Sequence, residues 1–159
     1  MSWAVTHAVI EAAPHDVFAV LQDPATYPLW VIGARRLRRT EGNWPSVGAT
    51  LHHELGALGV TVIRDVTVVR AAEPDTLLEL EAKLRPVGVV VVRLRLTPID
   101  VGTVVTMEER PVDGPVDQVH NPLITWGLQL RNRWALHRLA RLARGRAAES
   151  SSGPGAARP

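Results

Sequence analysis

Residues 77–96 have the sequence LLELEAKLRPVGVVVVRLRL, and their alternation decides the fold. Apolar and charged residues alternate in both halves, which is the period of a β-strand with one buried face. The turn formers Pro86 and Gly88 separate the halves, so the stretch predicts an antiparallel hairpin. Pairing Leu80 with Leu94, and Glu79 with Arg95, places apolar residues on one face and opposite charges on the other.

Five further segments have the composition of strands: Trp3 to Glu11, Arg35 to Thr40, Thr50 to Leu55, Val62 to Arg70 and Thr103 to Arg110. Two short helices are predicted after the first strand, one beginning at Pro14 and one at Pro24 with Asp23 as its cap. A long helix is predicted from Asn121 to about Arg146, because this segment has no interior proline.

These elements predict the α+β class, with a curved seven-stranded antiparallel sheet around one long C-terminal helix. A sheet that curls around a single helix buries both apolar surfaces and leaves a site for a small apolar ligand at its mouth. We expect one domain over residues 1–146. A disordered tail is expected at residues 147–159, which are dominated by small and helix-breaking residues.

Composition excludes several classes of protein. The chain has 159 residues, 46% of them apolar and 21% charged, which suits one globular domain. It contains no cysteine, so disulfides, thiolate metal sites and cysteine nucleophiles are excluded. Neither a phosphate-binding glycine loop nor a nucleophile turn around Ser2 or Ser46 is present, and we expect no cofactor. Without a signal peptide or a long apolar segment, we expect a cytoplasmic protein with no stable membrane insertion.

Positive charge is concentrated near the C-terminus. Residues 120–159 hold seven basic residues and one acidic residue, whereas the whole chain has a net charge of only +2. This segment is either a patch for phosphate or an anionic surface, or the solvated face of a helix. The high isoelectric point reflects the predominance of arginine, so we expect no nucleic-acid partner.

Three stretches resemble the START-like, or SRPBCC, superfamily. They are Ala8 to Pro24 with Tyr27 to Trp30, Gly102 to Glu109, and Pro122 to Leu142. Residues 42–53 are similar to a polyketide cyclase/dehydrase-like branch of that superfamily. The resemblance implies the helix-grip (START/Bet v 1-like) fold, with a cavity between sheet and helix. The superfamily includes ligand carriers and ring-forming catalysts, and the resemblance alone assigns no catalytic residue.

Three polar residues interrupt apolar faces of the predicted elements: His53, Glu109 and Asn132. Buried polar groups need partners, so these residues either satisfy one another or orient a ligand. A desolvated Glu109 beside His53 forms a candidate acid–base pair for cyclisation or dehydration. The alternative is that His53 and Glu109 lie at strand ends in water.

The sequence His52-His53-Glu54 invites a metal interpretation, but neighbouring strand residues point to opposite faces. Two ligands on one face are too few, so we expect no metal site and interpret His52 and Glu54 as a surface pair.

Aromatic and apolar residues complete the predicted binding site. The chain has five tryptophans but one tyrosine and one phenylalanine, and indole suits a planar or lipidic ligand. Trp126 and Trp134 share a second apolar stripe of the long helix, and for each tryptophan core packing is the alternative. The candidate ligand-binding residues are Trp30, Trp44, His53, Met107, Glu109, Trp126, Leu128 and Asn132.

Three functions remain open from the sequence. The first is binding of a hydrophobic small molecule, lipid-, aromatic- or polyketide-like, between sheet and helix. The second is a polyketide cyclase/dehydratase acting on such a ligand, although no recognisable catalytic motif decides whether the chain is an enzyme. The third is an interaction module whose basic C-terminal helix meets a protein or an anionic surface.

Overall fold

The computed structural model describes residues 3–57, 61–86, 88–114 and 122–153, without the side chains of residues 57, 61–63 and 122–125. Its strands are β1 (Ala4–Ile10), β2 (Ala34–Glu41), β3 (Thr50–Ala57), β4 (Thr61–Glu73), β5 (Leu77–Arg85), β6 (Gly88–Ile99) and β7 (Gly102–Asp113). Its helices are α1 (Pro14–Leu21), the short 3-10 helix η1 (Pro24–Thr26), α2 (Tyr27–Trp30) and α3 (Pro122–Ser151).

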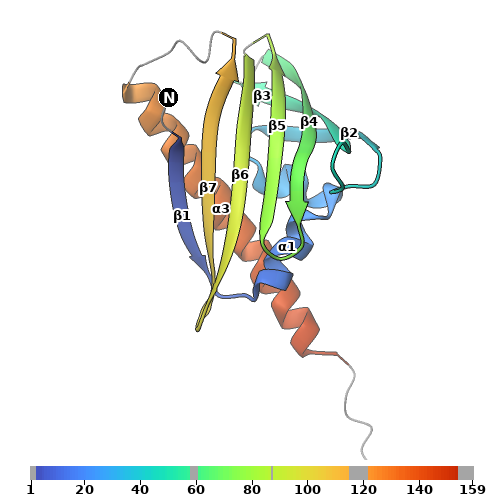
Figure 1. Ribbon diagram of the computed structural model, residues 1–159, viewed down its shortest axis with the longest axis vertical. Coiled ribbons are helices and arrows are strands. Elements are labelled where there is room, and N and C mark those ends of the chain that lie inside the picture. Colours follow the sequence, from blue (N-terminus) through green and yellow to red (C-terminus); the bar gives the residue numbers. More distant parts are fainter. Residues whose placement is uncertain (1–2, 58–60, 87, 115–121, 154–159) are drawn as a thin grey trace, which may run out of the picture.

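The strands form one antiparallel sheet in the order β1-β7-β6-β5-β4-β3-β2. The sheet is curved, and α3 runs along one face of it (Figure 1). This arrangement confirms the predicted helix-grip fold. The arginine-rich strand β2 lies at one edge of the sheet, where charged side chains disfavour pairing with another chain.

The core lies between the concave face of the sheet and α3. Along α3 the buried positions recur with helical spacing, so one stripe of the helix packs inward. These positions are Asn132, Ala135, Leu136, Leu139, Ala140 and Ala143. Helices α1 and α2 also contact α3; α2 packs near β2, whereas α1 packs near β6 and β7.

The hairpin of β5 and β6 forms with a register that differs by two residues from the prediction. Leu80 pairs with Val92, and Glu79 pairs with Arg93. A shift of two residues leaves every side chain on its predicted face, so alternation cannot distinguish the two registers. The ion pair on the outer face is therefore between Arg93 and Glu79, with 2.7 Å from Nε to Oε2.

Helix α3 ends later than the sequence predicts. It continues to Ser151, so residues 147–151, which the sequence predicts as part of the tail, are helical. Ala147, Ala148 and Glu149 are compatible with a helix, and the Ser150 and Ser151 hydroxyls donate to carbonyl oxygens four residues earlier. The remaining tail positions 154–159, and the predicted cap Asn121, lie outside the described residues.

Candidate functional site

Tyr27, the first residue of α2, organises the interior near β3. The hydroxyl of the preceding residue Thr26 donates to the carbonyl of Val20 at 2.7 Å, which fixes this turn against α1. The Tyr27 ring stacks on the imidazole of His53, with 4.6 Å between ring centroids. The Tyr27 ring also makes edge-to-face contacts with the indoles of Trp30 and Trp44, with 5.3 and 6.5 Å between ring centroids. Tyr27 therefore joins three residues that the sequence placed in the site.

His53 has a carboxylate partner on the neighbouring strand. The register of β3 and β4 places His53 opposite Asp65, and both side chains point to the interior. Nε2 of His53 lies 2.9 Å from Oδ2 of Asp65 and 3.1 Å from the hydroxyl of Thr67. The side chains are almost fully buried, with 0% of His53 and 4% of Asp65 exposed. We call Tyr27, His53, Asp65 and Thr67 the His53 cluster.

The hydrogen bonds of this cluster fix its proton positions. Thr67 donates its proton to Oδ2 of Asp65 at 3.2 Å, so both oxygens near Nε2 of His53 act as acceptors. A neutral His53 therefore carries its proton on Nε2 and presents an acceptor lone pair at Nδ1. Among the described residues, neither Nδ1 of His53 nor Oδ1 of Asp65 has a hydrogen-bond partner. With a neutral His53, the cluster thus holds two unused acceptors in a buried place.

Tyr27 contributes a neutral hydroxyl to the same region. Burial raises the pKa of Tyr27 well above its ordinary value, because the phenolate would lose its hydration. The carboxylates of Asp65 and Glu109 raise this pKa further, while Thr67 and Arg131 act in the opposite direction. Tyr27 therefore stays protonated at physiological pH and keeps a hydrogen-bond donor in the interior.

A second buried polar group lies between β7 and α3, and it has complete hydrogen bonding. Asn132 donates from Nδ2 to Oε2 of Glu109 at 2.7 Å, and Arg131 donates to Oε1 at 2.5 Å. Arg131 also donates to Oδ1 of Asn132. We call these three residues the Glu109 cluster. The predicted pair of His53 with Glu109 is therefore not formed, since each residue has another partner, and neither lies at a strand end in water.

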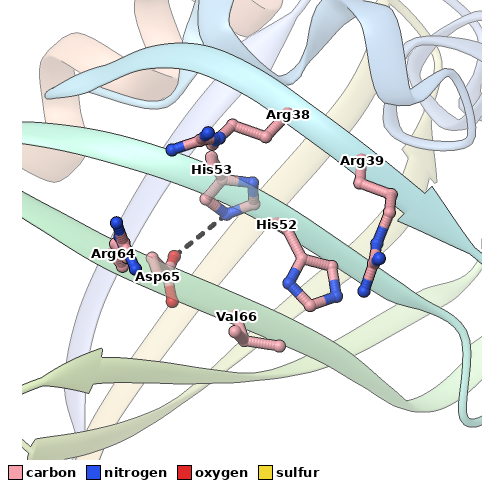
Figure 2. Close-up of a pocket in the computed structure, with 7 residues that line it drawn as sticks. All are labelled: Arg38, Arg39, His52, His53, Arg64, Asp65 and Val66. Atoms are coloured by element: carbon pink, nitrogen blue, oxygen red, sulfur yellow. Dashed lines mark ion pairs between the residues drawn. The ribbon is translucent and has the colours of Figure 1, made fainter.

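A basic pocket of about 390 Å³ lies over β2, β3 and β4 (Figure 2). Its lining residues are Arg38, Arg39, His52, His53, Arg64, Asp65 and Val66. His52 and Arg64 alternate along their strands with the inward-facing His53 and Asp65, so His52 and Arg64 point to the opposite side of the sheet. Arg38 and Arg39 already pair with Glu54 and Glu41. The pocket therefore borders the His53 cluster, because His53 and Asp65 are among its lining residues (Figure 2).

Residues 2–144 match the family described as "Polyketide cyclase / dehydrase and lipid transport". The chain belongs to this polyketide cyclase/dehydrase family. No curated protein sequence matches the chain.

Solved structures share the fold of this family member at low sequence identity. Protein CV1439 from Chromobacterium violaceum is 16% identical with a TM-score of 0.71, and the match covers 90% of this chain and 98% of that protein. DynU16, from the dynemicin biosynthetic locus, is 18% identical with a TM-score of 0.65, covering 89% of this chain and 46% of its own. The di-domain ARO/CYC StfQ, from the steffimycin biosynthetic pathway, is 15% identical with a TM-score of 0.65, covering 94% and 52% respectively.

In this member of the polyketide cyclase/dehydrase family, most of the predicted site residues are buried. Trp30, Trp44 and Met107 belong to the core, and the indole of Trp44 donates to the carbonyl of Leu21 at 3.1 Å. Leu128 is half-buried on α3. Trp126 differs, because it is 65% exposed on the outer face of α3. The structure therefore does not bring Trp126 to the interior.

The sequence did not single out Tyr27, Asp65 or Thr67. Tyr27 was visible only as the single tyrosine of the chain within the resembling stretch Tyr27 to Trp30. On β4, apolar residues occur on both faces, so the alternation did not mark Asp65 and Thr67 as inward-facing.

Among the described residues, no group of three or more metal-ligating side chains is found, and no helix is long and apolar enough to span a membrane. His52 lies near a glutamate on the surface, but the partner is Glu41, at 3.6 Å, and not Glu54.

Proposed function

We propose that the protein binds an apolar small molecule that carries a hydroxyl group, of the kind found in phenols and polyketide enols. The ligand lies between the concave face of the sheet and α3. Its hydroxyl donates to Nδ1 of His53 or Oδ1 of Asp65, and its apolar part packs near Tyr27, Trp30 and Met107.

The observation that carries this proposal is the pair of unused acceptors in the His53 cluster. An unpartnered buried polar atom costs about 1–3 kcal/mol, so two on adjacent side chains are unusual in a core that needs no further role. Both atoms are acceptors, so they match a ligand that donates. The apolar residues that surround the cluster favour a ligand whose remaining surface is hydrophobic.

Family membership supports a polyketide-like ligand over other phenols. The family description names polyketide cyclases and dehydrases, and lipid transport. Two proteins of similar fold are described by their place in biosynthesis: DynU16 by the dynemicin biosynthetic locus and StfQ by the steffimycin biosynthetic pathway. A folded polyketide presents enol or phenol hydroxyls on an apolar frame, and such a hydroxyl is the donor that Nδ1 of His53 and Oδ1 of Asp65 lack among the described residues.

A pair of matched probes tests the proposal. Calorimetric titration with 2-naphthol and with its methyl ether, 2-methoxynaphthalene, compares two aromatic ligands that differ in one donor. We expect 2-naphthol to bind about tenfold more tightly, because the ether leaves the buried acceptors unpaired.

The matched control is the double variant His53→Phe with Asp65→Leu, which removes both acceptors. This variant should bind the two probes about equally. Equal affinities in the unaltered protein, or a preference that survives in the variant, would contradict the proposal.

A second function, cyclisation with dehydration, is favoured by the geometry of His53 and Asp65. A lone pair at Nδ1 suits a general base, and Asp65 at Nε2 stabilises the imidazolium that forms. In an intramolecular aldol reaction, His53 removes a proton next to one carbonyl, and the carbanion forms a carbon–carbon bond with the second carbonyl. The His53 imidazolium returns its proton to the resulting alkoxide, and the hydroxyl later leaves as water with a proton from the neighbouring carbon, which gives the ring enone.

Conversion of heptane-2,6-dione to 3-methylcyclohexenone and water tests this second function. The conversion needs no oxidant, reductant or co-reactant, and the product is followed by its ultraviolet absorbance. We expect catalysis to fall by about 100-fold or more in His53→Phe, which is the usual contribution of a general base. A rate with protein equal to the rate without it would leave ligand binding as the function.

A further inference from the structure

The outer face of α3 carries exposed apolar side chains in its first half. Trp126, Leu130 and Trp134 are spaced by four residues and therefore lie along one side of the helix. Their exposed fractions are 65%, 41% and 57%. A contiguous exposed stripe with two tryptophans is uncommon on a protein surface that contacts only water, and it marks an interaction site. We call these three residues the tryptophan stripe.

The same face becomes basic in its second half. His137, Arg141 and Arg144 are exposed and continue the direction of the tryptophan stripe along the helix. The ring of His137 packs edge-on against Trp134, with 6.5 Å between centroids. The outer face of α3 is therefore apolar at its start and cationic toward its end.

Most of the arginines on α3 have no acidic neighbour in the described part of the chain. The helix contains six arginines and one acidic residue, Glu149, which give it a net charge of +5. Arg131 pairs with Glu109, and Arg146 pairs with Asp23. Within the described residues, no ion pair involves the other four, which are Arg133, Arg138, Arg141 and Arg144.

We propose that the outer face of α3 docks on an anionic lipid surface. The tryptophan stripe lies among the lipid headgroups, and the neighbouring arginines contact their phosphates. Indole rings favour this interface because they are apolar with one polar edge, and long arginine side chains reach headgroups while their stems stay on the apolar side. The helix lies in the plane of the interface.

Charge and shape favour a lipid surface over a protein partner. The exposed arginines of α3 lie on its solvent-facing side, where several of them can contact one extended anionic surface at the same time. The inward stripe of α3 is already used by the core, so docking through the outward stripe needs no unfolding. The proposal goes beyond the ligand binding proposed above, because the tryptophan stripe does not include any residue of the His53 cluster.

Vesicle co-sedimentation of the full chain tests the proposal. Vesicles of phosphatidylcholine alone are compared with vesicles that contain phosphatidylserine as about one third of the lipid. We expect binding to the anionic vesicles only, with a blue shift of tryptophan fluorescence as exposed indoles leave water. Binding should weaken between about 0.05 M and about 0.5 M salt, because salt screens the arginines.

Two variants and two controls locate the surface. Trp126→Ser with Trp134→Ser should abolish the fluorescence shift and lower the partition coefficient at least tenfold. Arg141→Gln with Arg144→Gln should lower it about fivefold for each arginine. Arg35→Gln with Arg36→Gln removes the same charge from the edge strand β2, and Leu29→Ser with Val101→Ser removes other exposed apolar side chains. Both controls should bind as the unaltered protein does.

Three results would overturn the proposal. One is no binding to anionic vesicles at low salt. Another is an equal loss of binding in the β2 control, which would show unspecific attraction by net charge. The third is a concentration-dependent dimer that the tryptophan variant abolishes, without vesicle binding, which would assign the tryptophan stripe to a second copy of the chain.

Discussion

The Glu109 cluster and the His53 cluster are buried against the same face of the sheet, but they differ in hydrogen bonding. In the first, both oxygens of Glu109 accept, one from Arg131 and one from Asn132. In the second, Nδ1 of His53 and Oδ1 of Asp65 have no partner among the described residues. A satisfied group of this kind stabilises the contact of a helix with a sheet, whereas unused acceptors lower stability and offer a place for a donor.

The largest expected effect comes from breaking the Glu109 cluster. Asn132→Leu removes the amide that donates to Oε2 of Glu109, while the carboxylate stays 6% exposed. We expect the free energy of unfolding to fall by about 3 kcal/mol, the upper range for a hydrogen bond to a charged group. Urea unfolding measures the loss.

Two controls accompany this variant. Asn43→Leu makes the same substitution at an exposed position and should change stability by about 0.5 kcal/mol or less. Combining Glu109→Leu with Asn132→Leu should recover most of the loss, because no buried carboxylate remains. An Asn132→Leu protein as stable as the unaltered one would contradict a structural role for this cluster.

The burial of Tyr27 near the two clusters makes the free energy of unfolding depend on pH. The pKa of Tyr27 is raised in the folded protein, so the folded state keeps a proton that the unfolded state loses above its ordinary value of 10.0. The stabilising contribution is therefore complete below pH 10 and is lost as the pH rises further, by about 1.4 kcal/mol per pH unit.

Tyrosinate absorbance measures this directly, because the chain has one tyrosine. The folded protein should show no ionisation near pH 10, and the urea-unfolded protein should show it. Tyr27→Phe identifies the signal. Ionisation near the ordinary value in the folded state would show that Tyr27 is solvated and does not belong to the interior.

The smallest change in stability is expected in the His53 cluster itself. His53→Phe with Asp65→Leu replaces a buried pair by apolar groups, and such replacements are neutral or stabilising. Urea unfolding should therefore give a free energy no lower than that of the unaltered protein. A loss above about 2 kcal/mol would place this pair with the Glu109 cluster as a structural contact, and the comparison between them would fail.

Much of the fold was predictable from the sequence because alternation and helical spacing depend on neighbouring residues. The strands, the short helices and α3 follow from these patterns, and so do the inward positions of His53, Glu109 and Asn132. The register of the β5–β6 hairpin was not predictable, because a shift of two residues preserves both faces.

The partners in the site were less predictable, because they depend on tertiary placement. Asp65 meets His53 only through the register of β3 and β4, and Tyr27 meets it only through the position of α2. The tryptophans of α3 lie on a second apolar stripe, and periodicity alone does not say which of two stripes faces the sheet. The structure places Trp126 and Trp134 outside.

The most direct test of the central proposal observes the unused acceptor itself. Nitrogen-15 NMR of the histidine rings, with His53→Phe to identify the signals, reports whether Nδ1 of His53 carries a lone pair or accepts a hydrogen bond. We expect Nδ1 to show an unprotonated nitrogen in the free protein and to shift toward a hydrogen-bonded one when 2-naphthol is added, while Nε2 keeps its proton. Binding of 2-naphthol that leaves the Nδ1 signal of His53 unchanged would contradict the account.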